Sequence, residues 1–127
     1  MSILKSKFLW IVLSIAVLLV AFVAVAPKPI DMDLNKLGNG QTSVVFIYDP
    51  NLLVSSEQAA EMNRARELIG ARANFLIAKV GDPNSAAFRV GYKVYETELL
   101  FFNKKAELFH RQVALVSAEE LVEKLVE

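Results

Sequence analysis

The longest hydrophobic run of the chain covers residues 8–26 and contains one serine and no charged residue. As a helix of about 19 residues rising 1.5 Å each, it would be roughly 28 Å long, close to the hydrocarbon thickness of a bilayer. Lys5 and Lys7 precede the run and Trp10 lies near its start, which favours a cytoplasmic N-terminus with an aromatic ring at the membrane interface. The pattern predicts a transmembrane helix at residues 8–26, after a cytoplasmic N-terminus of residues 1–7.

The run also has the layout of a cleaved secretory signal, because Ala24, Val25 and Ala26 fit a cleavage site of the A-x-A type. Two features favour a retained signal-anchor instead. The run exceeds the roughly 7–15 residues of a signal core, and Pro27 would hinder cleavage of the bond before it. We expect a single-pass inner-membrane protein whose C-terminal domain is periplasmic or otherwise extracytoplasmic; a cleaved signal would export the same domain.

Residues 27–41 show no sustained apolar period and contain two prolines, two glycines and charges of both signs. This composition predicts an extended linker between the membrane and the domain. Residues 42–127 then suffice for one small domain with a single core.

Two short apolar runs beyond the linker, at residues 43–48 and 73–80, predict buried strands, and both end at turns that contain Asp and Pro. A helix is predicted between them, from Ser55 to Gly70, with Ser55 and Gln58 forming a capping box. Its apolar positions have helical spacing: Ala59, Met62, Ala65, Leu68 and Ile69. A strand, a crossover helix and a second strand indicate a parallel, right-handed unit.

The rest of the chain predicts a short helix, a hairpin and a final helix. The short helix covers residues 84–92, with Asn84 or Ser85 as its cap. We expect three of its side chains to face inward: Ala87, Phe88 and Tyr92. Residues 99–102 and 107–113 flank a polar turn and predict antiparallel strands, the second at a sheet edge. A capping box at Ser117 then opens a C-terminal helix with an apolar stripe.

The order strand, helix, strand, short helix, hairpin and helix is that of the minimal thioredoxin fold, and residues 42–127 resemble a thioredoxin-family domain. The resemblance rests on Phe101 and Phe102 before the hairpin turn and on Ser117 at the start of the last helix. Tyr92, Lys93 and Val94 are likewise similar to the tyrosine-glycine-valine sequence that leads into the third strand in that family. The resemblance implies an α/β, thioredoxin-like domain preceded by a single transmembrane helix.

The chain departs from the resembled family at the catalytic positions. The family carries a C-x-x-C motif between its first strand and first helix, where this chain has residues 49–56 and no cysteine. The cis-proline that faces the motif in the family is missing from residues 95–98. Because the whole chain lacks cysteine, its own side chains cannot perform thiol–disulfide exchange. The resemblance therefore implies a redox-inactive scaffold.

The charge and histidine content narrow the possible partners. From Thr42 onward the chain has ten Lys or Arg and twelve Asp or Glu, with no basic cluster, so we expect no nucleic-acid binding. One histidine, His110, and no cysteine supply few ligands for a metal, so we expect neither a metal nor a cofactor. The expected partner is a protein in or near the membrane.

Several polar residues have a possible chemical role and a simpler structural one. Ser55 or Ser56 at a helix N-terminus could activate a bound thiol, but a helix cap explains Ser55 and its capping box better. His110 is interpreted as an ordinary strand residue instead of a general base. Three aspartates lie in the linker and in a loop without the spacing of a cation site, which predicts solvated charge: Asp31, Asp33 and Asp49.

The loops before the first helix and before the third strand are the best candidates for a partner-binding surface. In the resembled fold these loops lie side by side and form the groove that holds extended peptides. The candidate residues are Asn51, Leu52, Leu53, Tyr95, Glu96 and Thr97. The alternative is that Leu53 and Val54 turn inward as a hydrophobic staple on the helix.

Three functions follow as hypotheses. The leading one is a membrane-anchored, redox-inactive binding or assembly module of a periplasmic or inner-membrane complex. The second is an oxidoreductase-related subunit that works with the cysteines of a partner or with a thiol cofactor. The third is a structural subunit of a secretion or conjugation-type membrane machine.

Overall fold

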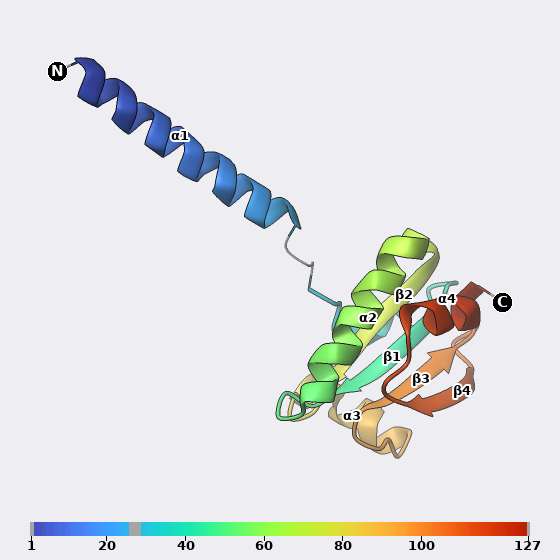
Figure 1. Cartoon of the computed structure of the whole chain (residues 1–127). Helices are drawn as coiled ribbons and strands as arrows, with labels where there is room; N and C mark the ends of the chain where they lie inside the picture. The colour runs from blue at the N-terminus through green and yellow to red at the C-terminus, as the bar shows by residue number, and fades with distance from the viewer. Residues whose placement is uncertain (1, 26–28, 127) are drawn as a thin grey trace.

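A computed structural model describes the backbone of residues 2–25 and 29–126, with side chains described for residues 5–19 and 29–126. Figure 1 shows helix α1 (Ser2–Val25) standing apart from a single α/β domain. Large apolar side chains of α1 between Phe8 and Leu19 are 46–69 % exposed.

The predicted span at residues 8–26 extends beyond the part whose side chains are described, which ends at residue 19. Among the described residues, no helix combines the length and the apolarity that crossing a membrane requires.

The domain is built on a mixed sheet of four strands in the order β2-β1-β3-β4. The strands are β1 (Thr42–Tyr48), β2 (Ala73–Lys79), β3 (Glu98–Phe102) and β4 (Leu108–Val113). β1 is parallel to β2, whereas β3 is antiparallel to both of its neighbours, β1 and β4. The predicted strands, the parallel pair and the hairpin with β4 at the sheet edge are confirmed.

Helices cover both faces of the sheet (Figure 1). α2 (Leu53–Ile69) and α4 (Ala118–Val126) pack on one face, against a core that includes Phe46, Phe101 and Leu121. α3 (Pro83–Gly91) packs on the other face, where Phe88 contacts a core that includes Ile47 and Phe102. The central strands are buried on both sides, which explains why they read as continuous apolar runs instead of alternating patterns.

The N-terminal segment, defined here as residues 29–41, is not the extended linker that its composition predicted. Ile30 packs against the core on the α2 face, and Leu34 and Leu37 pack against the core on the α3 face. A short 3-10 helix, η1 (Leu34–Lys36), allows the segment to fold around the outer edge of β2. Three well-spaced apolar residues suffice for this packing, although they form no regular period.

Two helix starts differ from the prediction, and the reason is local polar contacts. α2 begins at Leu53 instead of Ser55, and Ser55 is fully buried in its first turn. α3 is capped by the carboxylate of Asp82, which accepts a hydrogen bond from the amide of Asn84. Ala87, which was predicted to face inward, is exposed instead, and so is Leu68 of the predicted apolar positions of α2.

Candidate binding surface at the N-terminus of helix α2

The loop between β1 and α2 is fixed by Asp49, which is buried and not a solvated charge as predicted. Its carboxylate accepts a hydrogen bond from the amide of Asn51 at 2.9 Å, and its carbonyl oxygen accepts one from the amide of Leu52 at 3.1 Å. Its own amide donates to the hydroxyl oxygen of Ser55 at 3.0 Å. The predicted capping role of Ser55 is therefore wrong, because its side chain stabilises the preceding loop and Leu52 occupies the N-cap position.

Gln58, the other half of the predicted capping box, binds a distant part of the chain. Its side-chain amide donates to the carbonyl oxygen of Val116 at 2.8 Å, and its side-chain oxygen accepts from the amide of Val116 at 2.7 Å. Both residues are fully buried. The loop between β4 and α4 is thus held against the first turns of α2.

The loop before β3 is attached to the same region from the other side. The amide of Ala114 donates to the carbonyl oxygen of Thr97 at 2.9 Å, which ties residues 95–97 to the β4–α4 loop. The buried carboxylate of Glu98 accepts a hydrogen bond from the amide of Tyr95 at 3.2 Å and two from the guanidinium of Arg111, at 2.6 and 3.0 Å. These hydrogen bonds to Glu98 raise the pKa of Arg111. Three loops therefore lie side by side with little freedom to move.

The surface formed by these loops is apolar and includes residues that the sequence did not indicate. Leu52 is 36 % exposed, Leu53 77 % and Tyr95 72 %, so Leu53 does not form the inward-facing staple. Val113, the last residue of β4, and Leu115, in the β4–α4 connection, were not predicted and are 56 and 51 % exposed at the same end of the sheet. We call these five residues the docking patch.

The three other candidate residues have different positions. Asn51 and Glu96 are exposed at the border of the docking patch. Thr97 is 7 % exposed and its hydroxyl donates to the carbonyl oxygen of Glu96 at 2.7 Å, so it supports the loop from beneath. Val113 is placed at this end of the sheet by its pairing with Glu98, and Leu115 by the hydrogen bonds of its neighbours Ala114 and Val116; no local pattern indicated that either side chain is exposed there.

The positions expected to carry redox chemistry hold other residues. Leu52 occupies the N-cap of α2 and Ser55 lies in its first turn, both within residues 49–56, where the resembled family carries its C-x-x-C motif. The residue directly before β3 is Thr97 and not a proline, and its φ is 56°. Residues 49–56 therefore contain no cysteine, and residues 95–98 contain no proline.

The remaining candidate residues have ordinary structural partners. His110 lies on β4 with its ring 5.3 Å from that of Phe101 and its Nε2 3.1 Å from Gln112 Oε1. Asp31 pairs with Lys36, and this hydrogen bond lowers the pKa of Asp31. Within the described residues, no group of three or more His, Asp or Glu side chains is placed to hold a metal ion.

The fold is shared with solved proteins at low sequence identity. A mutant thioredoxin from Halobacterium salinarum matches 80 % of this chain and 91 % of its own, with a TM-score of 0.64 and 15 % identity. Chloroplastic thioredoxin z matches 76 % of this chain and 90 % of its own (TM-score 0.62, 12 % identity). A thioredoxin from Thermus thermophilus matches 79 % of this chain and 85 % of its own (TM-score 0.57, 16 % identity).

In sequence, the chain matches no protein-family model and no curated protein. The structural similarities establish an α/β, thioredoxin-like fold with a mixed four-stranded sheet. Because the chain contains no cysteine, it has this fold without the dithiol of a redox-active thioredoxin.

Proposed function

We propose that this protein is a membrane-anchored, redox-inactive thioredoxin-like domain that serves as a binding or assembly module of a periplasmic or inner-membrane complex. The observation that carries the proposal is the docking patch. Its five large side chains are 36–77 % exposed, at the start of α2, at the end of β4 and on adjoining loops that hydrogen bonds hold in place. Contiguous exposed apolar side chains commonly mark protein interaction sites.

Rigid loops favour binding because little conformational entropy is lost when a partner docks. The Gln58–Val116 and Glu98–Arg111 contacts fix the loops that carry Leu115 and Tyr95 before any partner is bound. A large aromatic side chain such as Tyr95, surrounded by aliphatic ones, is also typical of the residues that dominate interface energies.

The proposed anchor is α1 together with residue 26. It is supported by the charge-free run at residues 8–26, by the 24-residue length of α1 and by the exposure of its described apolar side chains. Lys5 and Lys7 on its N-terminal side orient it with the domain outside the cytoplasm.

Membrane extraction tests the anchor and its orientation. We expect the intact mass of the membrane-extracted protein to include residues 1–26, and we expect protease added to spheroplasts to digest the domain. A mass that begins at Pro27 would contradict retention of the anchor. Protection of the domain from protease would contradict the orientation.

Single substitutions in the docking patch test the binding role. Leu53→Asp and Leu115→Asp should weaken capture of the native partner by about 30-fold, since losing a central anchor residue commonly costs about 2 kcal/mol or more. Both side chains are exposed, so the melting temperature should change little.

Val90→Asp is the matched control for these variants. Val90 is 76 % exposed on α3 and lies outside the docking patch. If Val90→Asp reduces capture as strongly as Leu53→Asp, the docking patch is not the binding site. A large melting shift for Leu53→Asp would instead show that the residue acts through folding.

A further inference from the structure

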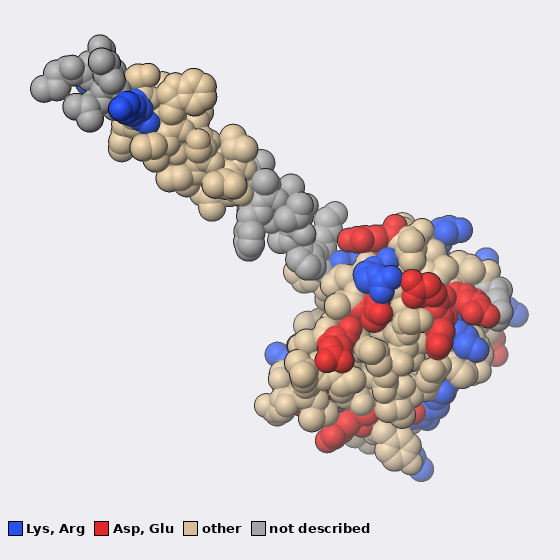
Figure 2. Space-filling model, in the orientation of Figure 1, with Lys and Arg blue, Asp and Glu red and all other residues tan. Residues whose placement is uncertain are grey.

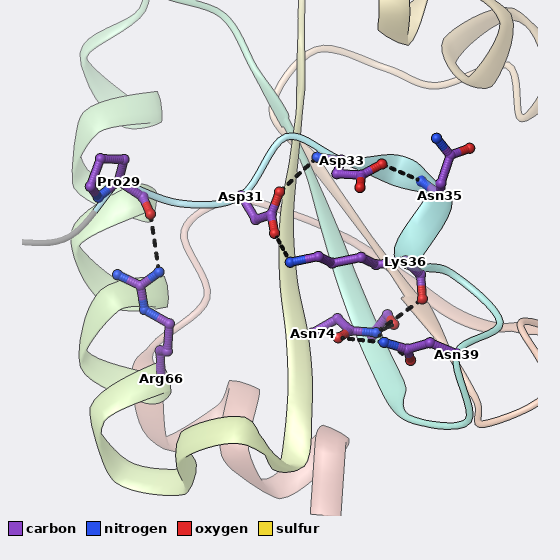
Figure 3. Close-up of polar contacts among 9 residues, drawn as sticks. Pro29, Asp31, Asp33, Asn35, Lys36, Asn39, Arg66 and Asn74 are labelled. Atoms are coloured by element: carbon purple, nitrogen blue, oxygen red, sulfur yellow. Dashed lines mark hydrogen bonds and ion pairs between the residues drawn. The ribbon is translucent and has the colours of Figure 1, made fainter.

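The N-terminal segment attaches the start of the domain to the outer edge of β2. The carbonyl oxygen of Pro29 accepts a hydrogen bond from Arg66 of α2 at 3.2 Å (Figure 3). The carbonyl oxygen of Asp31 accepts one from the amide of Ile77 at 2.8 Å. Asp31 also forms a parallel bridge with Leu76, while Ile30 packs against the core. The chain is therefore part of the folded domain from Pro29 onward.

Only three residues, 26–28, separate α1 from the first attached residue of the domain. An extended chain advances by at most about 3.6 Å per residue, so Pro29 lies within about 14 Å of Val25, the last residue of α1. If α1 is embedded in a bilayer, the surface around Pro29 lies at the headgroups.

The geometry of the sheet then decides which surfaces lie farther from the bilayer. β4 is three strands away from β2, which is about 14 Å at the spacing of hydrogen-bonded strands. The docking patch lies at the Leu53 end of α2, and two of its members, Val113 at the end of β4 and Leu115 after it, lie at the edge of the sheet opposite to β2.

The surface at the edge of β2 carries charged and polar side chains beside the 45 % exposed Met32. A cleft of about 330 Å³ lies there, with side chains of both charges: Asp31, Lys36 and Arg66, together with Gln41 and Asn74. Its apolar members Phe75 and Leu76 are buried. Figure 2 likewise shows acidic and basic side chains interspersed over the visible face of the domain. Such a surface suits the zwitterionic headgroup layer and not the hydrocarbon interior.

We infer that the edge of β2, with its charged cleft, rests against the phospholipid headgroups and holds the β4 edge of the sheet, with Val113 and Leu115 of the docking patch, away from the membrane. This inference rests on the proposed anchor. It identifies the lipid surface as the partner of one face of the domain and leaves the opposite face for a protein outside the bilayer.

Single-cysteine labelling of the full chain in phosphatidylcholine vesicles tests the orientation, because the chain has no cysteine of its own. Ala71→Cys places an environment-sensitive fluorophore at the exposed rim of the cleft beside β2. Lys105→Cys places it in the exposed β3–β4 turn, at the same end of the sheet but at the opposite edge. With nitroxide-headgroup lipids, we expect at least about twofold stronger quenching at residue 71, given the spacing of about 14 Å across the sheet.

Two controls separate this inference from the proposed anchor. Trp10 is the single tryptophan, so its quenching by brominated lipid reports the insertion of α1 independently of the labels. Inserting about ten Gly and Ser residues after residue 26 adds a flexible coil and should equalise the two labels.

The outcomes are distinct. In the protein without the Gly and Ser insertion, strong quenching of Trp10 together with equal quenching of the two labels would overturn the orientation and leave the anchor intact. An unquenched Trp10 would overturn the anchor and the orientation together. Stronger quenching at residue 71 that disappears with the longer linker would support the inference.

Discussion

Replacing Gln58 by leucine should be among the most damaging single changes in the domain. Gln58 and Val116 are fully buried and exchange two hydrogen bonds, at 2.8 and 2.7 Å. Leucine has a similar size but no polar atoms, so the amide and the carbonyl group of Val116 would both lose their partner. Because neither group can reach solvent, water would replace the lost bonds only if the loop opened.

The expected magnitude follows from these two groups. A buried polar group left without a partner costs about 1–3 kcal/mol, so the variant should lose about 2–6 kcal/mol of unfolding free energy. For a domain of this size, that corresponds to a fall in melting temperature of at least about 8 °C. Since the β4–α4 loop would also be released, binding through Leu115 should weaken in Gln58→Leu even below the melting temperature.

Near-UV circular dichroism of the protein in detergent is a suitable assay, because the tyrosines of the domain report its packing while Trp10 lies in α1. Glu57→Ala, at an exposed neighbouring position of α2, serves as the control and should change the stability by no more than about 0.5 kcal/mol. A loss below about 1 kcal/mol in Gln58→Leu would refute the reasoning, since it would mean that water satisfies Val116 at little cost.

Three further outcomes are expected. Arg111→Leu should lower the unfolding free energy by about 2–3 kcal/mol in chemical denaturation, because it leaves the buried carboxylate of Glu98 without its cation; an unchanged denaturation midpoint would contradict this. Lys36 lowers the pKa of Asp31 in the folded state, so this carboxylate stabilises the fold above its ordinary pKa, and the contribution is lost as the pH falls through the lowered value. Asp31→Asn should therefore be slightly less stable than the native chain at neutral pH, with the difference vanishing in acid; a difference that persists in acid would rule out the pair as its cause. The purified protein should not accelerate insulin reduction by dithiothreitol, because it has no thiol to form a mixed disulfide; a rate above the uncatalysed one would contradict redox inactivity.

Local sequence patterns determined most of the architecture. The strands β1 and β2 read as continuous apolar runs because both faces of the sheet are covered, and the apolar run, crossover helix and second run then required a parallel pair. The β3–β4 hairpin followed from its polar turn, and the cap of α4 from Ser117, whose hydroxyl accepts a hydrogen bond from the amide of Glu120. These features depend on residues close in sequence.

Polar residues were misread where a distant partner outweighed the local signal. Ser55 and Gln58 have the spacing of a capping box, but Gln58 binds Val116, 58 residues away, and Ser55 stabilises the loop at Asp49. The N-terminal segment has the composition of a linker, yet Ile30 and the backbone of Asp31 find partners on a sheet edge that no local pattern reveals.

The docking patch shows most clearly which features follow from the sequence and which depend on contacts between distant residues. The sequence alone determined that the chain's own side chains cannot perform thiol–disulfide exchange, because the absence of cysteine does not depend on the fold. It also indicated Leu53 and Tyr95, which lie on loops that the fold brings together. Only the tertiary structure decided that Leu53 is exposed and that Val113 and Leu115 extend the surface, because these positions depend on hydrogen bonds between residues far apart in the chain.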